Sequence, residues 1–379
     1  MQLSDVQHQD QPLDRLQRAM SAGRMPHAYI FSGPEGIGKE LTAARLAAVL
    51  LCSSPTTKKA STGREWRDAC GKCVDCELMQ AGNHPDFHRI YRTLNKVHPD
   101  SGVQKRKAVE LSIEVIRYFL IDKIGMRPSR DRAKVYVITE ADRLNPYSQN
   151  AILKTLEEPP EHSYLILLTP SADSLLDTTR SRCQQIGFNL LPADFIQDKL
   201  VRDHGATPAA ARFLSELAQG SAGRAIQYLQ LGLHESAPAL LEGLSRAGAD
   251  PLSFGNLLQD MAKKLAVRLR SGAGKDEGDD DDTADTNLSR LGQTIVLSVT
   301  SAILRDVMRL AAGAEAVALP GDSTTRSLAS TSNAERIRSA IKAVNSAEYQ
   351  IGRNVNAGLI FDNVGLSVGR SLQRAAARV

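Results

Sequence analysis

The residues best suited to binding phosphate lie in one short segment. Gly33, Gly36, Gly38 and Lys39 form a G-x-x-x-x-G-K sequence, preceded by an apolar strand-like segment and followed by a helix-like one. In a strand–loop–helix unit, such a loop surrounds phosphate groups with backbone N–H groups and a lysine. The spacing therefore predicts a loop that binds a nucleotide such as ATP.

Two residues that would hold Mg²⁺ beside this loop are changed. Glu40 replaces the Ser or Thr whose hydroxyl binds the ion, and Thr139 stands where an apolar strand is expected to end in Asp. Glu140, the acidic residue that would follow this Asp, is kept as a residual Walker B carboxylate. Binding of ATP with Mg²⁺ therefore remains open, and we expect hydrolysis by the chain alone to be negligible.

A second group of residues could bind a metal ion, namely Cys52, Cys70, Cys73 and Cys76. Four thiolates complete the tetrahedral shell of a structural Zn²⁺ and leave no position for a catalytic water. An iron–sulfur cluster is the alternative, because C-x₂-C-x₂-C also begins ferredoxin-type sequences, although Gln80 stands where a further cysteine would follow. His84 is either a substitute ligand or an ordinary turn histidine before Pro85.

An alternating series of strands and helices is expected to position these residues. Strands are indicated at 27–32, 86–91, 134–139 and 164–169, and helices at 40–51, 111–123 and 146–157. This alternation predicts an α/β fold with a parallel sheet. Beyond residue 187 only helices are indicated, at 191–230, 257–269 and 288–308, with Thr207 and Pro208 as a helix start.

The length of 379 residues fits three domains. Their predicted bounds are 1–188 for the α/β domain with the cysteine module at 52–76, 189–234 for a small helical domain, and 235–379 for a larger helical domain. Residues 271–287 are acidic and residues 320–333 are polar, so both are expected to be mobile loops. A contact between the acidic loop and a basic partner is the alternative interpretation.

Composition excludes several classes of protein. With 42% hydrophobic and 24% charged residues the chain cannot be disordered throughout, and a net charge of +4 argues against a strongly basic nucleic-acid coat. Aromatic residues make up 4%, too few for a platform that stacks single-stranded bases. No apolar run approaches the length of a membrane span and no secretory signal is present, so a cytoplasmic protein without membrane contact is expected.

The order of the motifs resembles that of bacterial clamp-loader subunits of the AAA+ class. The matching segments are His27-Ala28, the loop Gly33–Lys39, the cysteine module through Asp86, residues 150–160 and Ser181-Arg182-Cys183. The resemblance implies an AAA+ domain, a helical lid at 189–234 and a helical collar at 235–379 that joins a pentamer. The implied partners are motor and delta-type subunits, with the sliding clamp and primer–template DNA contacted through the assembly, which belongs to a DNA polymerase complex.

The resemblance also assigns roles to single residues. Arg182 corresponds to an arginine finger that reaches the ATP bound by a neighbouring subunit. Thr169 and Arg224 correspond to sensor residues of the nucleotide site. A local salt bridge for Arg182, a simple strand end at Thr169 and a solvated side chain for Arg224 are the alternatives. Residues 150–160 are expected to shape the subunit interface.

Three functions are consistent with these patterns. The favoured hypothesis is a stator-like clamp-loader subunit that supplies Arg182 without hydrolysing ATP efficiently itself. The second is an active motor ATPase of the same family or a related DNA-dependent ATPase. The third is a stand-alone zinc-dependent DNA-binding protein, whose basic residues would lie in a segment expected to be irregular: Lys58, Lys59, Arg64, Arg67 and Lys72.

Overall fold

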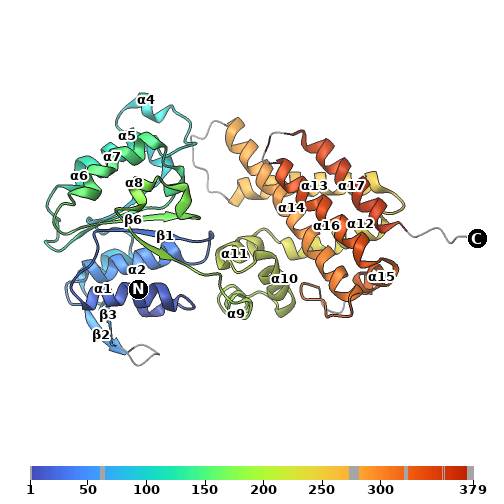
Figure 1. The fold of residues 1–379 in the computed structure, drawn as a ribbon, viewed down its shortest axis with the longest axis horizontal. Coiled ribbons are helices and arrows are strands. Elements are labelled where there is room, and N and C mark those ends of the chain that lie inside the picture. Colours follow the sequence, from blue (N-terminus) through green and yellow to red (C-terminus); the bar gives the residue numbers. More distant parts are fainter. Residues whose placement is uncertain are drawn as a thin grey trace, which may run out of the picture. The chain divides into compact units, whose positions relative to one another are not determined.

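The computed structural model describes residues 2–59, 65–272, 281–319, 323–351, 353 and 355–373. The chain divides into two compact units, Met1–Leu191 and Pro192–Val379 (Figure 1). The first contains the sheet and the second is helical throughout the part that the structure describes. The predicted α/β fold is therefore confirmed. The first unit ends close to the predicted boundary at residue 188, and the separation of lid from collar stays a prediction.

A five-stranded parallel sheet forms the centre of the first unit. Its strands, in spatial order, are β4 (Phe87–Ile90), β5 (Lys134–Ile138), β6 (Ser163–Thr169), β1 (Ala28–Ser32) and β7 (Gln184–Gly187). The four strands expected from the sequence are present, and β7 is an addition. Since the strands are parallel, the segments that follow β1, β4, β5 and β6 all leave the same edge of the sheet, where ligands bind in open α/β folds.

Alternate residues of each strand face opposite helical layers, as the period of two in a strand requires. Tyr29 and Phe31 of β1 pack toward α1 (Asp10–Ser21), α2 (Lys39–Leu51) and α3 (Val74–Gln80). Ala28 and Ile30 pack toward the other layer. That layer consists of α5 (Ile113–Ile116), a π-helical segment (Arg117–Ile121), α6 (Asp122–Ile124) and α7 (Pro146–Glu157). The sheet is thus buried on both faces, and this explains its nearly continuous apolar strands.

The cysteine module contains a small antiparallel hairpin that the sequence did not predict. Strands β2 (Thr56–Lys59) and β3 (Glu65–Asp68) pair within the segment expected to be irregular. The backbone of Arg67 exchanges hydrogen bonds with the Gln17 side chain of α1, at 2.9 Å in both directions. Asp68 accepts the N–H group of Leu3 at 2.7 Å. The hairpin depends on partners about 50 residues away in sequence, which local patterning does not reveal.

The second unit is an array of helices. These are α9 (Ala193–His204), α10 (Pro208–Ala218), α11 (Ala222–Gln230), α12 (Leu233–Arg246), α13 (Pro251–Gly272), α14 (Asp281–Ala311), α15 (Ser323–Thr331), α16 (Ala334–Ile351) and α17 (Ala357–Leu372). The side chain of Thr207 caps α10 by accepting the N–H group of Ala210 at 3.3 Å, as expected. In the helices from α12 to α17, buried apolar side chains such as Phe254, Leu304 and Phe361 form a core.

Two segments expected to be loops are partly helical. In the acidic segment 271–287, α14 already begins at Asp281, because no proline or glycine interrupts the sequence from there to residue 291. Residues 273–280 of that expected loop lie outside the described part of the chain. In the polar segment 320–333, α15 buries Thr325, Leu328 and Ala329, which gives this helix a packed face despite its polar composition.

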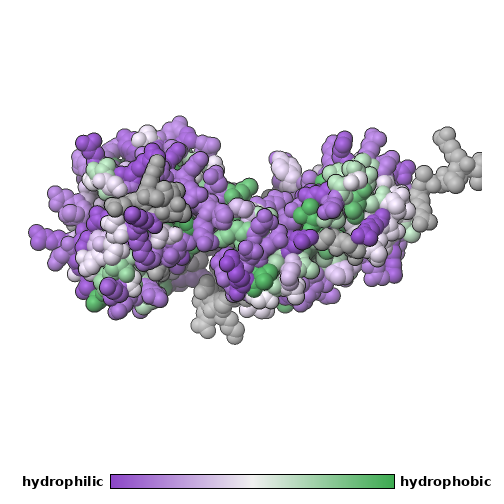
Figure 2. Space-filling view, turned by 90° about the horizontal axis from the view of Figure 1, so that it is seen from below, coloured by the Kyte–Doolittle hydropathy of each residue, from purple (hydrophilic) through white to green (hydrophobic). Residues whose placement is uncertain are grey.

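On the face drawn in Figure 2, hydrophilic residues predominate and hydrophobic residues form small separate patches.

The remaining short elements of the first unit are α4 (Ser101–Gln104), α8 (Asp177–Arg180) and the 3₁₀ turns Leu3–Asp5, Arg92–Val97, Ala141–Arg143 and Ala172–Ser174. Among the described residues, no helix combines the length and the apolar character needed to cross a membrane.

Candidate functional site

The glycine-rich loop joins β1 to α2, as its sequence predicts. Gly33, Gly36 and Gly38 have φ values of 141°, 73° and 101°, in a region that residues other than glycine rarely adopt. A Cβ atom on Gly33 would lie 2.7 Å from the carbonyl oxygen of Phe188. The loop conformation is therefore available only because glycine occupies these positions.

Lys39 lies in the first turn of α2 and is almost buried, with 8% of its surface exposed. Its Nζ atom donates hydrogen bonds to the carbonyl oxygens of Gly33 and Pro34, the latter at 2.7 Å. The ammonium group thus lies inside the concave side of its own loop. A bound phosphate would interact with the lysine at this place.

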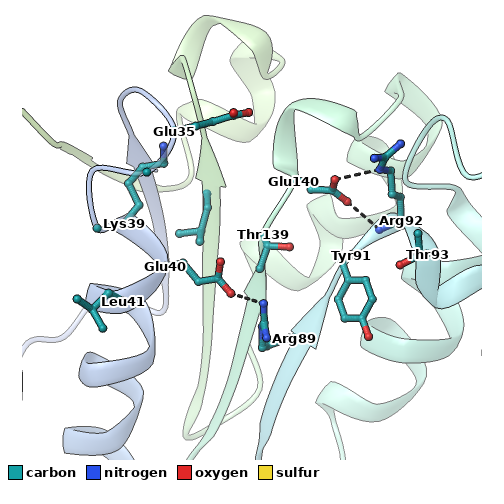
Figure 3. Close-up of a pocket in the computed structure, with 13 residues that line it drawn as sticks. Glu35, Lys39, Glu40, Leu41, Arg89, Tyr91, Arg92, Thr93, Thr139 and Glu140 are labelled. Carbon is teal, nitrogen blue, oxygen red and sulfur yellow. Dashed lines mark hydrogen bonds and ion pairs between the residues drawn. The ribbon is translucent and has the colours of Figure 1, made fainter. Parts of the chain in front are cut away.

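A cavity of about 640 Å³ opens beside the loop. Its lining comes from the loop, from α2 and from the segments that follow β4 and β5 (Figure 3). The lining residues are Glu35, Gly36, Gly38, Lys39, Glu40, Leu41, Arg89, Tyr91, Arg92, Thr93, Thr139, Glu140 and Leu168. Four of the predicted nucleotide-site residues, Gly36, Gly38, Lys39 and Glu140, therefore meet at one cavity, next to Gly33.

The carboxylate at the first predicted metal position, Glu40, and the one that follows the second position, Glu140, are both paired with arginines. Glu40 forms an ion pair with Arg89 of β4, and Glu140 accepts hydrogen bonds from Arg92 Nε at 3.0 Å and Arg92 N at 3.1 Å (Figure 3). Thr139 places a neutral hydroxyl group where a carboxylate would bind Mg²⁺. The carboxylates of Glu40 and Glu140 are thus engaged by protein cations.

Sequence reasoning missed Arg89 and Arg92. Arg89 lies within a correctly predicted strand and Arg92 just after it, but nothing in the local pattern indicates their partners. Glu40 and Glu140 lie 49 and 48 residues away along the chain. Only the pairing of β4 with β5, and the position of α2 at the same edge of the sheet, brings these charges together.

Of the two expected sensor residues, Thr169 is not among the residues that line this cavity. Thr169 ends β6 and is buried, and its hydroxyl contacts the carbonyl oxygen of Ser171 at 2.7 Å and Ser174 Oγ at 2.8 Å. Arg224 lies at the exposed start of α11 in the second unit, where its backbone N–H group donates to Ser221 Oγ at 3.2 Å. Their roles as sensors stay predictions.

Arg182 lies in the turn between α8 and β7, away from the cavity lining. Its Nε and Nη2 atoms contact Glu157 Oε1 at 2.9 and 2.7 Å, and its side chain remains 35% exposed. The local salt bridge considered as the alternative for Arg182 is therefore present. Such a pair still leaves an exposed guanidinium that a neighbouring molecule can reach.

The four clustered cysteines form a compact group. Each offers a sulfur atom, and these atoms lie within 4.8 Å of one another. The Cys52 and Cys73 sulfurs are 3.8 Å apart and the Cys70 and Cys76 sulfurs are 3.9 Å apart. A tetrahedron with Zn–S bonds of about 2.3 Å has edges of about 3.8 Å. The cluster could therefore hold Zn²⁺, whereas disulfide bonds require sulfurs about 2 Å apart.

The pKa values of the thiols indicate which of them would need a bound cation to ionise. Burial raises the pKa of Cys52, and it raises that of Cys76 to about 12. Burial also acts on Cys73, but hydrogen bonds from Ser53 and from the Cys76 backbone outweigh it and lower the pKa to about 6. At neutral pH the protein alone thus opposes ionisation of Cys52 and Cys76, and a bound Zn²⁺ would supply the charge that deprotonates them.

His84 is not part of this sulfur cluster. It is buried, with 4% of its surface exposed. Its Nδ1 atom accepts the N–H group of Asp86 at 3.1 Å, and its Nε2 atom lies 3.5 Å from Asp75 Oδ1. Asp75 in turn binds Arg130 Nε at 2.7 Å. Asp75 therefore links α3 to the polypeptide that precedes β5, and His84 lies against Asp75.

Comparison with known proteins identifies relatives that are all subunits of DNA polymerase III. The family model described as "DNA polymerase III, delta subunit" matches residues 8–192. The tau subunit of Escherichia coli DNA polymerase III is 32% identical over 271 residues, which cover 70% of this chain and 38% of that protein. The delta' subunit of Bacillus subtilis is 31% identical over 53% of this chain and 54% of its own length. The delta' subunit of Escherichia coli is 29% identical over 61% and 63%. The chain thus spans less than two thirds of each relative.

Proposed function

Because the chain belongs to the clamp-loader family of AAA+ proteins, we propose that it is the stator-like subunit of a DNA polymerase III clamp loader, in the position of delta'. In this role it supports an ATPase site on a neighbouring subunit and hydrolyses little ATP itself. The observation that carries the proposal is the pairing of Glu40 with Arg89 and of Glu140 with Arg92 in the loop cavity.

This pairing argues against efficient hydrolysis. A working site needs a hydroxyl and a carboxylate on Mg²⁺, together with a group that positions the attacking water. Here Glu40 and Thr139 occupy the two metal positions, and both oxygens of Glu140 accept hydrogen bonds from Arg92. Lys39 and the loop N–H groups remain suited to phosphate, so nucleotide binding without turnover is compatible with the geometry.

Arg182 is the group that this chain contributes to catalysis elsewhere. Its guanidinium lies at the surface and would stabilise the charge that develops on the γ-phosphate of ATP bound to a neighbour. In the loop cavity of this chain, Glu40 and Glu140 are paired with arginines. Catalysis in trans therefore explains why the chain keeps Arg182 while its own Mg²⁺ positions are altered.

The cysteine module is proposed to hold one structural Zn²⁺. Cys52, Cys70, Cys73 and Cys76 would provide all four ligands, so no open position remains for chemistry. When bound, the ion neutralises thiolates and cross-links the chain segments that carry them. Its proposed function is to stabilise the module at the surface of the α/β unit.

The assembly provides the remaining partners. We expect a pentamer with motor and delta-type subunits in the cytoplasm, in which the helices of 235–379 form a collar and 189–234 form a lid. The sliding clamp and primer–template DNA would be contacted through the complex. The modest net charge of +4 supports this division, because DNA-binding proteins that act alone carry a stronger basic surface.

An active motor ATPase is the second candidate. The intact G-x-x-x-x-G-K loop and the 32% identity to a tau subunit favour it. The isolated chain distinguishes the two hypotheses, because a motor retains turnover on its own or with DNA. We expect negligible hydrolysis; a steady-state rate near about 1 s⁻¹, within the ordinary enzyme range, would favour the motor instead.

The proposed finger is tested by Arg182→Ala in a reconstituted clamp loader. Single-turnover hydrolysis at the neighbouring site is expected to fall by about 10³-fold, since arginine fingers contribute about that much or more. Clamp loading should fall with it, while the variant chain stays folded. Arg18→Ala is the matched control, because Arg18 is an exposed arginine that pairs with Asp14 within α1. Wild-type hydrolysis in the Arg182 variant contradicts the assignment.

A further inference from the structure

Glu157 and Arg182 join the end of α7 to the turn after α8. Glu157 is the last residue of α7, and one of its oxygens, Oε1, contacts both Nε and Nη2 of Arg182. The two side chains are 50% and 35% exposed, so the pair lies at the surface without being fully solvated. Double engagement of one oxygen fixes the direction of the guanidinium more closely than a single contact would.

Helix α7 is itself held at both ends. Asn145 caps its start by accepting the N–H group of Ser148 at 2.9 Å. Near its end, the carbonyl oxygen of Leu156 accepts a hydrogen bond from His27 Nε2 at 2.8 Å. His27 immediately precedes β1, the strand that leads into the phosphate loop. The carboxylate of Glu157 is therefore attached to a helix whose position is fixed against the central sheet.

A second contact holds α8 against α7. Gln149, buried within α7, accepts the N–H group of Leu176 at 2.8 Å with its Oε1 atom. Its Nε2 atom donates to the carbonyl oxygen of Leu144 at 3.0 Å, which orients the amide. Leu176 is the residue just before α8. The base of the Arg182 turn is thus fixed by Gln149, and Glu157 fixes its guanidinium.

The remaining contacts of Arg182 come from its own turn. Nη1 donates to the carbonyl oxygen of Thr178 at 3.0 Å and to Ser181 Oγ at 3.3 Å. Together with the two contacts to Glu157, these use four of the five N–H groups of a guanidinium. One N–H group of Arg182 is left for a ligand outside the described contacts, and the direction of the whole plane is already set.

We infer that Glu157 is the positioning residue of Arg182. It holds the guanidinium in one orientation before the neighbouring subunit binds. The finger can then contact the γ-phosphate without a change of side-chain rotamer. Preorganised charges of this kind act without reorganisation at the moment of reaction. The inference rests on the proposed role of Arg182 as a finger in trans. It assigns a function in the same reaction to Glu157, which would otherwise be an ordinary solvated residue at a helix end.

The test uses Glu157→Ala in the reconstituted clamp loader. We expect kcat at the neighbouring site to fall by between about 10- and 100-fold, because small misplacements of a catalytic group have effects of this size. The KM for ATP should stay unchanged, since Glu157 does not touch the nucleotide. Glu161→Ala is the matched control, because Glu161 is an exposed glutamate four residues further along the chain.

A double-mutant cycle separates positioning from a merely structural role. In the Arg182→Ala background, Glu157→Ala should cause no further loss, because its effect passes through the guanidinium. The thermal unfolding temperature of the isolated Glu157 variant should match that of the Glu161 variant. Unchanged or faster hydrolysis in the Glu157 variant overturns the inference, and so does a full additional loss in the Arg182 background. If Arg182→Ala itself has no effect, the proposed finger is wrong instead.

Discussion

At the scale of single residues, the loop cavity combines cations with carboxylates that are already engaged. Lys39, Arg89 and Arg92 surround it, while Glu40 and Glu140 are paired with the two arginines. A phosphate group would therefore meet positive charge, while these two carboxylates are engaged by arginines and are not available to recruit Mg²⁺. The side chains around the loop, and not the loop sequence alone, thus determine whether the site can support hydrolysis.

Gly33→Ala is expected to destabilise the first unit by about 1–3 kcal/mol, the usual cost of a side chain in a disallowed backbone region. The φ value of 141° and the 2.7 Å approach to the Phe188 carbonyl oxygen leave no space for Cβ. Urea unfolding measures the loss. Gly125→Ala is the control, because its φ value is −75° and no atom lies within 4 Å of the added carbon. Equal stabilities of the two variants would contradict this account.

At the scale of elements, the cysteine module joins an exposed strand to segments that pack into the core. The four residues of β2 are exposed, and Trp66 of β3 is the large side chain that anchors the hairpin in the core. The cysteines come from the end of α2, from the segment after β3 and from α3. A metal ion bound by the cysteines would therefore connect three elements of the first unit.

Cys73→Ser is expected to abolish the binding of one Zn²⁺ per chain, because a hydroxyl is a poor substitute for a thiolate ligand. Metal analysis of the purified protein checks this, and the melting temperature of the first unit should fall with the loss of metal. Cys183→Ser is the matched control, since Cys183 lies outside the sulfur cluster. Iron with visible absorbance in the unaltered protein would refute the zinc assignment.

At the scale of the whole molecule, each unit has its own core and a distinct composition of elements. The α/β unit carries the phosphate loop, the cysteine module and Arg182, whereas the second unit contributes only helices in its described part. This division suits a subunit that is assembled through one part and regulates a neighbour through another. It also predicts that the functional chemistry requires partner subunits.

Reconstitution with the other clamp-loader subunits of the same organism should incorporate this chain into a defined complex, because its proposed finger lacks a substrate in isolation. Mass measurement of the purified assembly checks its presence and stoichiometry. The expected result is one copy of the chain in a pentamer whose ATPase activity depends on it. A chain that stays monomeric with every candidate subunit would contradict the stator hypothesis.

The sequence by itself determined the features that depend on short spacings. The G-x-x-x-x-G-K loop, the changes at Glu40 and Thr139, the cysteine spacing and four of the five parallel strands were all predictable, because local patterns and strand periodicity encode them. The β2–β3 hairpin and the helix α15 were not, since their stability comes from distant packing partners.

Only the tertiary structure decided which charges meet. Glu40 reaches Arg89 across 49 residues, Glu140 reaches Arg92 across 48, and Arg182 reaches Glu157 across 25. No periodicity relates the members of these pairs, because the order of strands in the sheet and the placement of α2, α7 and α8 determine their distances. The sequence therefore identified the loop, and the fold determined that Glu40 and Glu140 are paired with arginines and that Arg182, the proposed finger, is paired with Glu157.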